Sequence, residues 1–248
     1  MAAYSYALEQ PIRPVYKRCR FWVISTTTAD DLVARGISRD QIDVIYCGFN
    51  DDLLRPEPGL TKTSFPSVIY VGRLKKYKRV DLIIEAVARL AAKLPDLRLY
   101  VVGTGDREAD LRRQVSALGI EKNVEFTGFV SETRKKELLT RSWVGAQTST
   151  KEGWGLGVIE AAACGTPTVA SESPGLIESV RANETGFLVP HGHVEALTEK
   201  LRLLLTEDAL RTQYGAAACE WAQKFSWEEM ARRSLEFIQL NTVSTAGK

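Results

Sequence analysis

Short apolar segments alternate with segments of helical periodicity through the central part of the chain. The apolar segments are rich in β-branched residues and lie at 68–72, 97–103, 124–128, 143–148 and 168–171. The helix-period segments lie at 80–93, 107–118, 132–141 and 156–164. This alternation predicts an α/β fold, a Rossmann-like doubly wound parallel sheet with helices on both faces. Ligands of such sheets bind outside the carboxyl ends of the strands, so we expect the loops there to carry the site.

Two further regions flank this alternation. Residues 21–25 and 42–46 predict strands, and residues 29–35 predict a helix between them. A polar stretch with several prolines, 51–66, has the composition of a linker. After the central part, helices are predicted at 194–205, 208–225 and 227–240. Ser226 is the expected N-cap of the last helix, with Glu229 three residues later.

The segment 151–167, KEGWGLGVIEAAACGTP, carries the most informative chemistry. Its glycines predict a tight turn, after which a helix begins near Leu156. The first amides of a helix have no intrahelical partner and lie at its positive end, so they suit a diphosphate. Glu160, one turn further on, could accept hydrogen bonds from a sugar hydroxyl, and Glu152 would face the other end of the ligand. Acidic residues near a helix start are also common dipole partners, so spacing alone leaves both interpretations open.

The same segment resembles a known signature. A Glu, seven residues and a second Glu in the setting EGWGLGVIEAAACGTP are similar to the motif of the retaining GT-B-fold glycosyltransferases, glycosyl transferases group 1. That family has an amino-terminal acceptor domain and a carboxyl-terminal domain that binds a nucleoside-diphosphate sugar. The resemblance implies that 67–225 is the donor-binding domain and 1–50 a remnant of the acceptor domain. The stretch 51–66 would be the linker, and 226–248 a crossing helix and tail.

A basic segment, GRLKKYKRVD, follows the first strand of the central part. Fixed cations stabilise a departing nucleoside diphosphate, although a basic turn can also be simply solvated. The resemblance implies that Arg73 and Lys78, after Gly72, grip the diphosphate; Arg79 stands where the family often has Gly. The sequence contains no Asp-x-Asp pair of the kind that holds a metal in many sugar transferases. We therefore expect neither a metal nor a cofactor.

The resemblance assigns the remaining roles. Glu160 would hold the ribose, Glu152 the sugar hydroxyls, and the amides of Gly155 and Leu156 the diphosphate. The expected catalytic residues are Arg73, Lys78 and Glu152. The expected donor-binding residues are Gly72, Gly103, Phe129, Val130, Gly155, Leu156 and Glu160, with Phe129 and Val130 in the segment that meets the nucleobase. A main-chain contact suits several bases, so the sequence does not identify the base.

Composition limits both the binding partners and the cellular compartment that we expect for this protein. The 248 residues include 33 Lys and Arg against 31 Asp and Glu, a net charge of +2 that gives no argument for nucleic acid. Four scattered cysteines form no metal or disulfide pattern. With no signal-peptide pattern and no membrane-length apolar run, we expect a cytoplasmic protein. The basic residues 134–136 leave a peripheral contact with the inner membrane open, although a solvated helix face is the favoured reading.

The resemblance implies a retaining glycosyltransferase of polysaccharide or glycoconjugate biosynthesis, and the missing Asp-x-Asp pair favours one that is metal-independent. Its donor would be a nucleoside-diphosphate sugar, and its acceptor an unknown sugar or lipid-linked molecule. Apolar positions of the last helix and its approach (Phe225, Trp227, Met230, Leu235 and Ile238) would be exposed and favour self-association or a partner chain that supplies the acceptor domain. The alternative is a donor-binding subunit or non-catalytic nucleotide-sugar binding module. Nothing in the sequence indicates a phosphorylase or an epimerase of the same fold.

Overall fold

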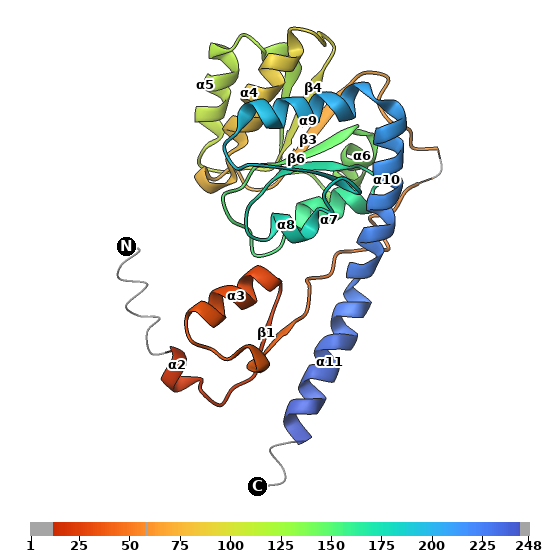
Figure 1. Cartoon of the computed structure of the whole chain (residues 1–248). Coiled ribbons are helices and arrows are strands. Elements are labelled where there is room, and N and C mark those ends of the chain that lie inside the picture. Colours follow the sequence, from red (N-terminus) through yellow and green to blue (C-terminus); the bar gives the residue numbers. More distant parts are fainter. Residues whose placement is uncertain (1–11, 58, 244–248) are drawn as a thin grey trace.

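A six-stranded parallel sheet occupies the part of the chain between residues 67 and 189 (Figure 1). The computed structural model describes residues 12–57 and 59–243. The strands are β3 (Ser67–Val71), β4 (Arg98–Val102), β5 (Val124–Gly128), β6 (Val144–Gln147), β7 (Thr168–Ser171) and β8 (Gly186–Val189). Their order is β5-β4-β3-β6-β7-β8, and every neighbouring pair is parallel. The chain runs outward from β3 to β5 and then returns to the other side of β3, so the connections change direction between β3 and β6.

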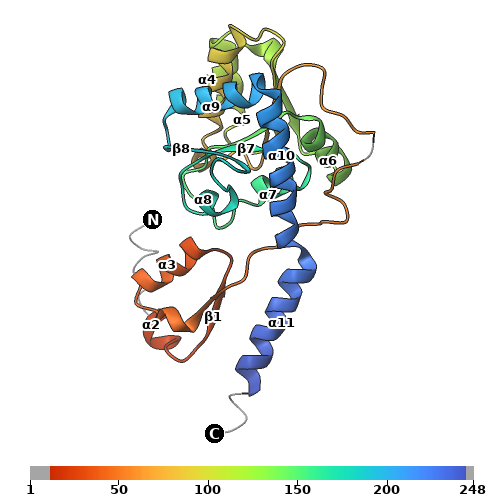
Figure 2. The same cartoon turned by 45° about the vertical axis from the view of Figure 1, so that its right-hand side comes forward.

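Helices cover both faces of this sheet, and each face has its own apolar core (Figure 2). On one face α4 (Val80–Ala91), α5 (Glu108–Ala117) and α9 (Val194–Thr206) pack with strand residues that include Val68 and Tyr70. On the other, α6 (Glu132–Arg141), α7 (Leu156–Ala163) and α10 (Asp208–Ala222) pack with Ile69 and Val102. Alternate residues of β3 serve opposite cores because successive side chains of a strand point to opposite faces. The doubly wound α/β prediction is confirmed.

A smaller strand–helix–strand unit precedes the large sheet, as the sequence predicts. It contains α2 (Ile12–Val15), β1 (Phe21–Val23), α3 (Thr26–Ala34), the 3-10 turn η1 (Arg39–Gln41) and β2 (Ile42–Val44). β1 and β2 pair in parallel and have a small core of their own. α3 begins three residues before its predicted start because Ser25 Oγ accepts a hydrogen bond from Thr28 N (3.1 Å) and caps the helix.

The last helix, α11 (Trp227–Val243), leaves the large domain and runs beside the small unit (Figure 2). Its predicted N-cap is confirmed, because Ser226 Oγ accepts a hydrogen bond from Glu229 N (3.1 Å). Arg233 donates to Val44 O (2.9 Å), and the rings of Trp22 and Phe237 meet edge to face with centroids 5.4 Å apart. The chain therefore crosses between the two units twice, once before β3 and once before α11.

The expected apolar exposure on α11 is only partly present. Trp227 and Leu235 are 51% and 55% exposed. Phe225 is buried, because it packs against other aromatic rings, and Met230 is half-buried, with its Sδ accepting from Gly48 N (3.3 Å). In the described ranges, no helix combines the length and the apolar character that crossing a bilayer requires.

Two features of the structure were not predicted from the sequence. β8 was not predicted: it has four residues and begins with Gly186, where a Cβ would lie 2.0 Å from Thr168 O of β7. The stretch 51–66 forms no α-helix or strand among its described residues, and Lys62 fastens it to the large domain by donating to Ser142 O and Thr166 Oγ1 (both 2.7 Å). Burial lowers the pKa of Lys62 to about 8. The division at 50, 66 and 225 stays a prediction, and its residues 1–11, 58 and 244–248 lie outside the described ranges.

Candidate functional site

A pocket of about 250 Å³ lies at the carboxyl ends of β3 and β6, where the connections of the sheet change direction. Doubly wound sheets bind their ligands at this position. The lining residues are Val71, Gly72, Arg73, Lys78, Gln147, Glu152, Trp154, Gly155, Leu156, Gly157, Val158, Glu160 and Leu176. The fold thus brings together all three residues expected to be catalytic and four of the expected donor-binding residues. Gly103, Phe129 and Val130 are not among the lining residues.

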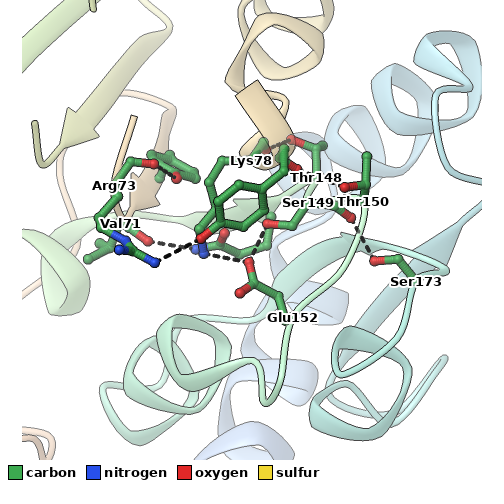
Figure 3. A network of polar contacts seen from close by, with 11 residues as sticks. Val71, Arg73, Lys78, Thr148, Ser149, Thr150, Glu152 and Ser173 are labelled. Atoms are coloured by element: carbon green, nitrogen blue, oxygen red, sulfur yellow. Dashed lines mark hydrogen bonds and ion pairs between the residues drawn. The ribbon is translucent and has the colours of Figure 1, made fainter. Parts of the chain in front are cut away.

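Lys78 and Glu152 form an ion pair in this pocket (Figure 3). Lys78 Nζ lies 2.5 Å from Glu152 Oε1, and the two side chains are only 13% and 14% exposed. Ser149 Oγ donates to the same carboxylate oxygen. A cation and a carboxylate from distant parts of the sequence therefore meet at the position where the loops of β3 and β6 face each other.

The turn that carries Lys78 is held against the loop after β6. This 3-10 turn, η2 (Lys76–Lys78), receives a hydrogen bond from Thr150 N at Tyr77 O (2.8 Å). Thr148 Oγ1 donates to Arg79 O (2.7 Å), which fixes the start of α4 (Figure 3). The position of Lys78 is thus set by hydrogen bonds from the loop after β6 to the main chain of its turn, and not by its side chain alone.

The backbone conformation of Arg79 explains why the family often has glycine at this position. Its φ of 51° lies in the left-handed region, where a side chain is strained. The guanidinium compensates by binding Asp81 through Nε and one terminal nitrogen, at 3.0 and 2.9 Å. Arg79 therefore adopts a left-handed backbone conformation that glycine would reach without strain.

Arg73 lies on the rim of the pocket and is exposed. Its guanidinium donates to Tyr77 Oη (3.1 Å), and its carbonyl accepts from Tyr70 Oη (2.9 Å). The Gly103–Gly105 turn supports this loop from behind. A Cβ at Gly103, whose φ is +124°, would lie 2.1 Å from Gly72 O. Gly103 therefore acts on the pocket through the Arg73 loop.

The loop of Glu152 is fixed by the segment after β7. Glu152 N donates to Pro174 O (2.9 Å), and Ser173 Oγ donates to Ser149 O (2.7 Å; Figure 3). Gly175 has a φ of +79°, and a Cβ there would lie 2.5 Å from Glu152 O. Backbone therefore packs on backbone on the side of Glu152 that faces away from Lys78.

The start of α7 differs in one detail from expectation. Gly155 is its N-cap, and a Cβ there would lie 2.3 Å from Ser179 Oγ, so the Ser179 side chain would have to shift to admit any other residue. The Leu156 amide, expected to face a diphosphate, donates to Trp154 O (2.8 Å). A ligand at this amide would have to share or replace that bond.

Glu160 has a partner that sequence reasoning missed. Lys135 of α6 reaches Glu160 Oε1 at 2.8 Å, and both side chains are 13% exposed. Burial raises the pKa of Glu160, although the Lys135 ammonium acts against this rise. Burial alone would lower the pKa of Lys135, but its hydrogen bonds to Glu132 and Glu160 outweigh that effect and the pKa is raised.

The solvated face expected for residues 134–136 is wrong for Lys135 and Lys136. Lys136 is 14% exposed and pairs with Glu57 (2.7 Å), while Arg134 pairs with Glu137. The sequence does contain a signal for the burial of Lys135, because this residue lies three and four positions before the buried Leu138 and Leu139. A charge on the apolar face of a helix indicates a buried partner.

Phe129 and Val130 follow β5 at the edge of the sheet, away from the change of direction. Phe129 is 86% exposed, and Val130 packs partly against the core beneath α6 and α7. Their contact with a nucleobase stays a prediction.

A carboxylate outside the pocket joins the two units of the chain. Glu178 of α8 (Leu176–Ser179) accepts from Thr26 N (2.7 Å) and Thr27 N (2.8 Å) at the start of α3. Tyr46 Oη also donates to it (3.3 Å). Since Leu176 lines the pocket, α8 links the pocket wall to the small unit.

Comparisons with solved structures identify the fold. A structure of Anabaena HepE in complex with UDP-glucose superposes with a TM-score of 0.82 at 24% identity, covering 91% of this chain and 65% of that one. Sucrose-phosphate synthase of Thermosynechococcus elongatus gives a TM-score of 0.78 at 29% identity, covering 92% and 58%. Both agree with the carboxyl-terminal part of a GT-B fold.

Sequence comparisons identify the family. D-inositol 3-phosphate glycosyltransferase of Rhodococcus opacus is 34% identical over an alignment of 241 residues, which covers 90% of this chain and 53% of that protein. Phosphatidyl-myo-inositol mannosyltransferase of Mycobacterium leprae is 29% identical over 246 residues, covering 95% and 63%. The chain therefore spans between about half and two thirds of the length of these relatives. The profile of the family described as glycosyl transferases group 1 matches residues 55–221, more than half of the chain, and the chain belongs to this family.

Proposed function

We propose that this chain binds a nucleoside-diphosphate sugar in the pocket between β3 and β6 and forms the donor half of a glycosyltransferase. One observation carries the proposal: two cations, Arg73 and Lys78, and two carboxylates, Glu152 and Glu160, surround the start of α7 in a single pocket. The cations suit a diphosphate and the carboxylates suit hydroxyl groups. Family membership and a fold shared with a protein solved with UDP-glucose support the same assignment.

In this proposal the diphosphate lies near Arg73, Lys78 and the Gly155 amide. Cleavage of the glycosidic bond leaves negative charge on the phosphate oxygens, and fixed positive groups stabilise that charge without reorganising. Lys78 is already oriented by the fold of η2, so it needs only to exchange Glu152 for a phosphate oxygen. Arg73, on the exposed rim, would close over the ligand from the solvent side.

The two carboxylates would bind opposite ends of the ligand. Glu160 would accept hydrogen bonds from the ribose hydroxyls, and its ion pair with Lys135 favours the ionised form that can do so. Glu152 would accept from hydroxyls of the sugar once Lys78 turns to the phosphate. The ligand thereby replaces an internal ion pair with contacts of its own.

We further propose retention of anomeric configuration and catalysis without a metal ion. Retention follows the resemblance noted in the sequence, with attack on the face that the diphosphate leaves and with the diphosphate taking the proton of the acceptor. Arg73 and Lys78 would supply the positive charge that a metal provides elsewhere. The absence of an Asp-x-Asp pair from the sequence agrees with this charge compensation.

The site assignment is tested by titration calorimetry with UDP, GDP and ADP in EDTA. Lys78→Ala and Glu160→Ala should each weaken binding of the preferred nucleotide by at least about tenfold, because each removes a charge-assisted contact. Lys75→Ala is the matched control, since Lys75 pairs with Asp106 (3.1 Å) and does not line the pocket. Unchanged affinity in both pocket variants would overturn the assignment.

Stereochemistry and metal use are tested by proton NMR of the matching nucleotide sugar incubated with the protein in EDTA. Water then acts as the acceptor, and the hexose released first should keep the anomeric configuration of the donor. Release of the inverted anomer would contradict retention. Turnover only after addition of Mg²⁺ or Mn²⁺ would contradict metal independence.

For the acceptor, a sugar or lipid-linked molecule, we propose that a partner chain or a second copy contributes. The exposed Trp227 and Leu235 of α11 lie on a helix that also borders a hollow of about 380 Å³ beside β2. Apolar exposure of this kind favours association. Light scattering at micromolar concentration should give a mass above 27.6 kDa, whereas a monodisperse monomer would contradict self-association.

A further inference from the structure

In the described part of the chain, the Glu152 side chain makes both of its polar contacts through one carboxylate oxygen (Figure 3). Lys78 Nζ lies 2.5 Å from Glu152 Oε1, and Ser149 Oγ donates to the same atom. An ionised carboxylate can accept hydrogen bonds at both of its oxygens. Since Glu152 lines the pocket, Oε2 is the oxygen that its internal partners leave for a ligand.

The Ser149 hydroxyl is buried and its main chain is held from two sides. Ser149 is 0% exposed and is not among the residues that line the pocket. Its carbonyl accepts from Ser173 Oγ (2.7 Å), in the segment after β7. The next amide, Thr150 N, donates to Tyr77 O (2.8 Å), in the turn before α4. Any effect of this hydroxyl on a ligand must therefore pass through Glu152.

We propose that Ser149 is a positioning residue that holds Glu152 in place for the sugar while Lys78 moves to the diphosphate. The inference rests on the proposed function, in which a ligand takes Lys78 from Glu152. Oε1 then keeps a single internal donor, the Ser149 hydroxyl, and a hydroxyl that donates to a carboxylate forms a charge-assisted hydrogen bond. Glu152 thus stays oriented, with Oε2 available to a hydroxyl of the glycosyl group.

The reason for a second donor lies in the exchange of Lys78. Without the Ser149 hydroxyl, a diphosphate that removes Lys78 would leave the Glu152 carboxylate with no internal donor. The side chain would then occupy several rotamers, and the sugar would have to order it on binding. This cost falls on the sugar contact, because the proposed contacts of the nucleoside and the diphosphate do not involve Glu152.

Titration calorimetry in EDTA measures what the sugar adds to binding. The quantity is the dissociation constant of the bare diphosphate divided by that of its nucleotide sugar, for UDP with UDP-glucose, GDP with GDP-mannose and ADP with ADP-glucose. We expect Ser149→Ala to lower this ratio about three- to tenfold. Ser142→Ala is the matched control, because the Ser142 hydroxyl is equally buried but donates to Leu138 O (2.7 Å). It should lower the melting temperature and leave the ratio unchanged.

A double-mutant cycle separates positioning of Glu152 from a general structural role of Ser149. If Ser149 acts through Glu152, Ser149→Ala lowers the ratio in the wild-type background and changes it no further in Glu152→Ala. Equal reductions in the two backgrounds would overturn the inference. So would an unchanged ratio in Ser149→Ala alone.

Two further variants keep the test decisive. Ser149→Cys retains a weak donor, so its ratio should lie between those of the wild type and Ser149→Ala, and it replaces Ser149→Ala in the cycle if that variant does not fold. A reduced ratio in Glu152→Ala but not in Ser149→Ala would overturn the inference and leave the proposed function standing. An unchanged ratio in Glu152→Ala would overturn the proposed role of Glu152 and the inference with it.

Discussion

Glu160 illustrates, at the scale of single residues, how a carboxylate can be buried in a pocket and still serve as an acceptor. Burial raises its pKa, and Lys135 at 2.8 Å acts in the opposite direction. Glu152 also has a cationic partner, because Lys78 Nζ lies 2.5 Å from its Oε1. Each of these two carboxylates thus has an internal ion pair before a ligand enters.

Replacing Lys135 by Met should weaken nucleotide binding in a pH-dependent way. Without the ammonium the pKa of Glu160 rises further, so the carboxylate takes up its proton, and ceases to accept from the ribose, at a higher pH. We expect the affinity of Lys135→Met to be about tenfold lower near pH 6 and to approach the wild-type value at higher pH. Calorimetric titrations between pH 5 and pH 8 measure this.

Lys136→Met is the matched control, since Lys136 is equally buried but pairs with Glu57 outside the pocket. Parallel pH profiles for the wild type and Lys135→Met would show that Lys135 only supports the structure.

Motif reasoning identified four charged residues of the pocket, Arg73, Lys78, Glu152 and Glu160. It could do so because each lies within a short signature whose spacing is fixed by a turn or a helix start. Lys135 was missed because its partner is 25 residues away and is set by the packing of α6 on α7.

Among the structural elements, the two loops after β3 and β4 together support the side of the pocket that Arg73 lines. Gly72 N donates to Val102 O (3.0 Å), and Leu74 N donates to Thr104 O (2.9 Å). Gly103 is in contact with this backbone, so its glycine character is a packing requirement and not a sign that it touches the ligand.

Gly103→Ala should therefore destabilise the fold and weaken nucleotide binding together. The new Cβ would lie 2.1 Å from Gly72 O, and the backbone of the Arg73 loop would have to move. We expect a loss of about 2–4 kcal/mol in the free energy of unfolding. Gly119→Ala is the control, because its φ is +66° but its Cβ would enter open space, so only about 1–2 kcal/mol of backbone strain is expected. Urea unfolding of both variants measures the two losses in the free energy of unfolding. Equal losses would refute the packing argument.

The alternation of strands and helices was predictable because each element is long enough to show its period. β8 was not, since four residues that begin with glycine carry little periodic signal. The start of α3 was placed too late because three threonines, 26–28, separate the cap at Ser25 from Ala29. Periodicity therefore did not predict the ends of elements, because local features such as caps and glycines set them.

For the whole molecule, Glu178 connects the large domain with the small unit. Burial alone would raise the pKa of Glu178, but hydrogen bonds from the Thr27 and Thr26 amides outweigh it and the pKa is lowered. A lowered carboxyl pKa stabilises the folded state above the unfolded value of about 4.5, and this stabilisation is lost as the pH falls.

Glu178→Gln should therefore loosen α3 without affecting the six-stranded sheet. At pH 7 we expect hydrogen exchange in α3 to speed up by an amount equivalent to about 1–2 kcal/mol, because a charge at the helix start is lost. The difference from the wild type should shrink as the pH falls toward 4. Glu184→Gln, which breaks only a surface pair with Arg181, is the control. Unchanged exchange in α3 would show that Glu178 does not hold the two units together.

The arrangement of the two units was anticipated only through the resemblance. Periodicity predicted a small strand–helix–strand unit, but it carried no information on how α11 returns to it. The aromatic cluster that joins the crossing segments, including Tyr46, Trp154 and Phe225, gathers residues from three distant parts of the sequence.

Thermal unfolding with UDP, GDP and ADP in EDTA tests the central claim, a metal-free nucleotide-sugar site between β3 and β6. At about a hundred times the dissociation constant, a ligand that binds only the folded state adds roughly 2.7 kcal/mol, or about 5–10 °C. We expect such a shift with one of the three nucleotides and its loss in Lys78→Ala. A cooperative transition that none of the nucleotides moves would contradict it.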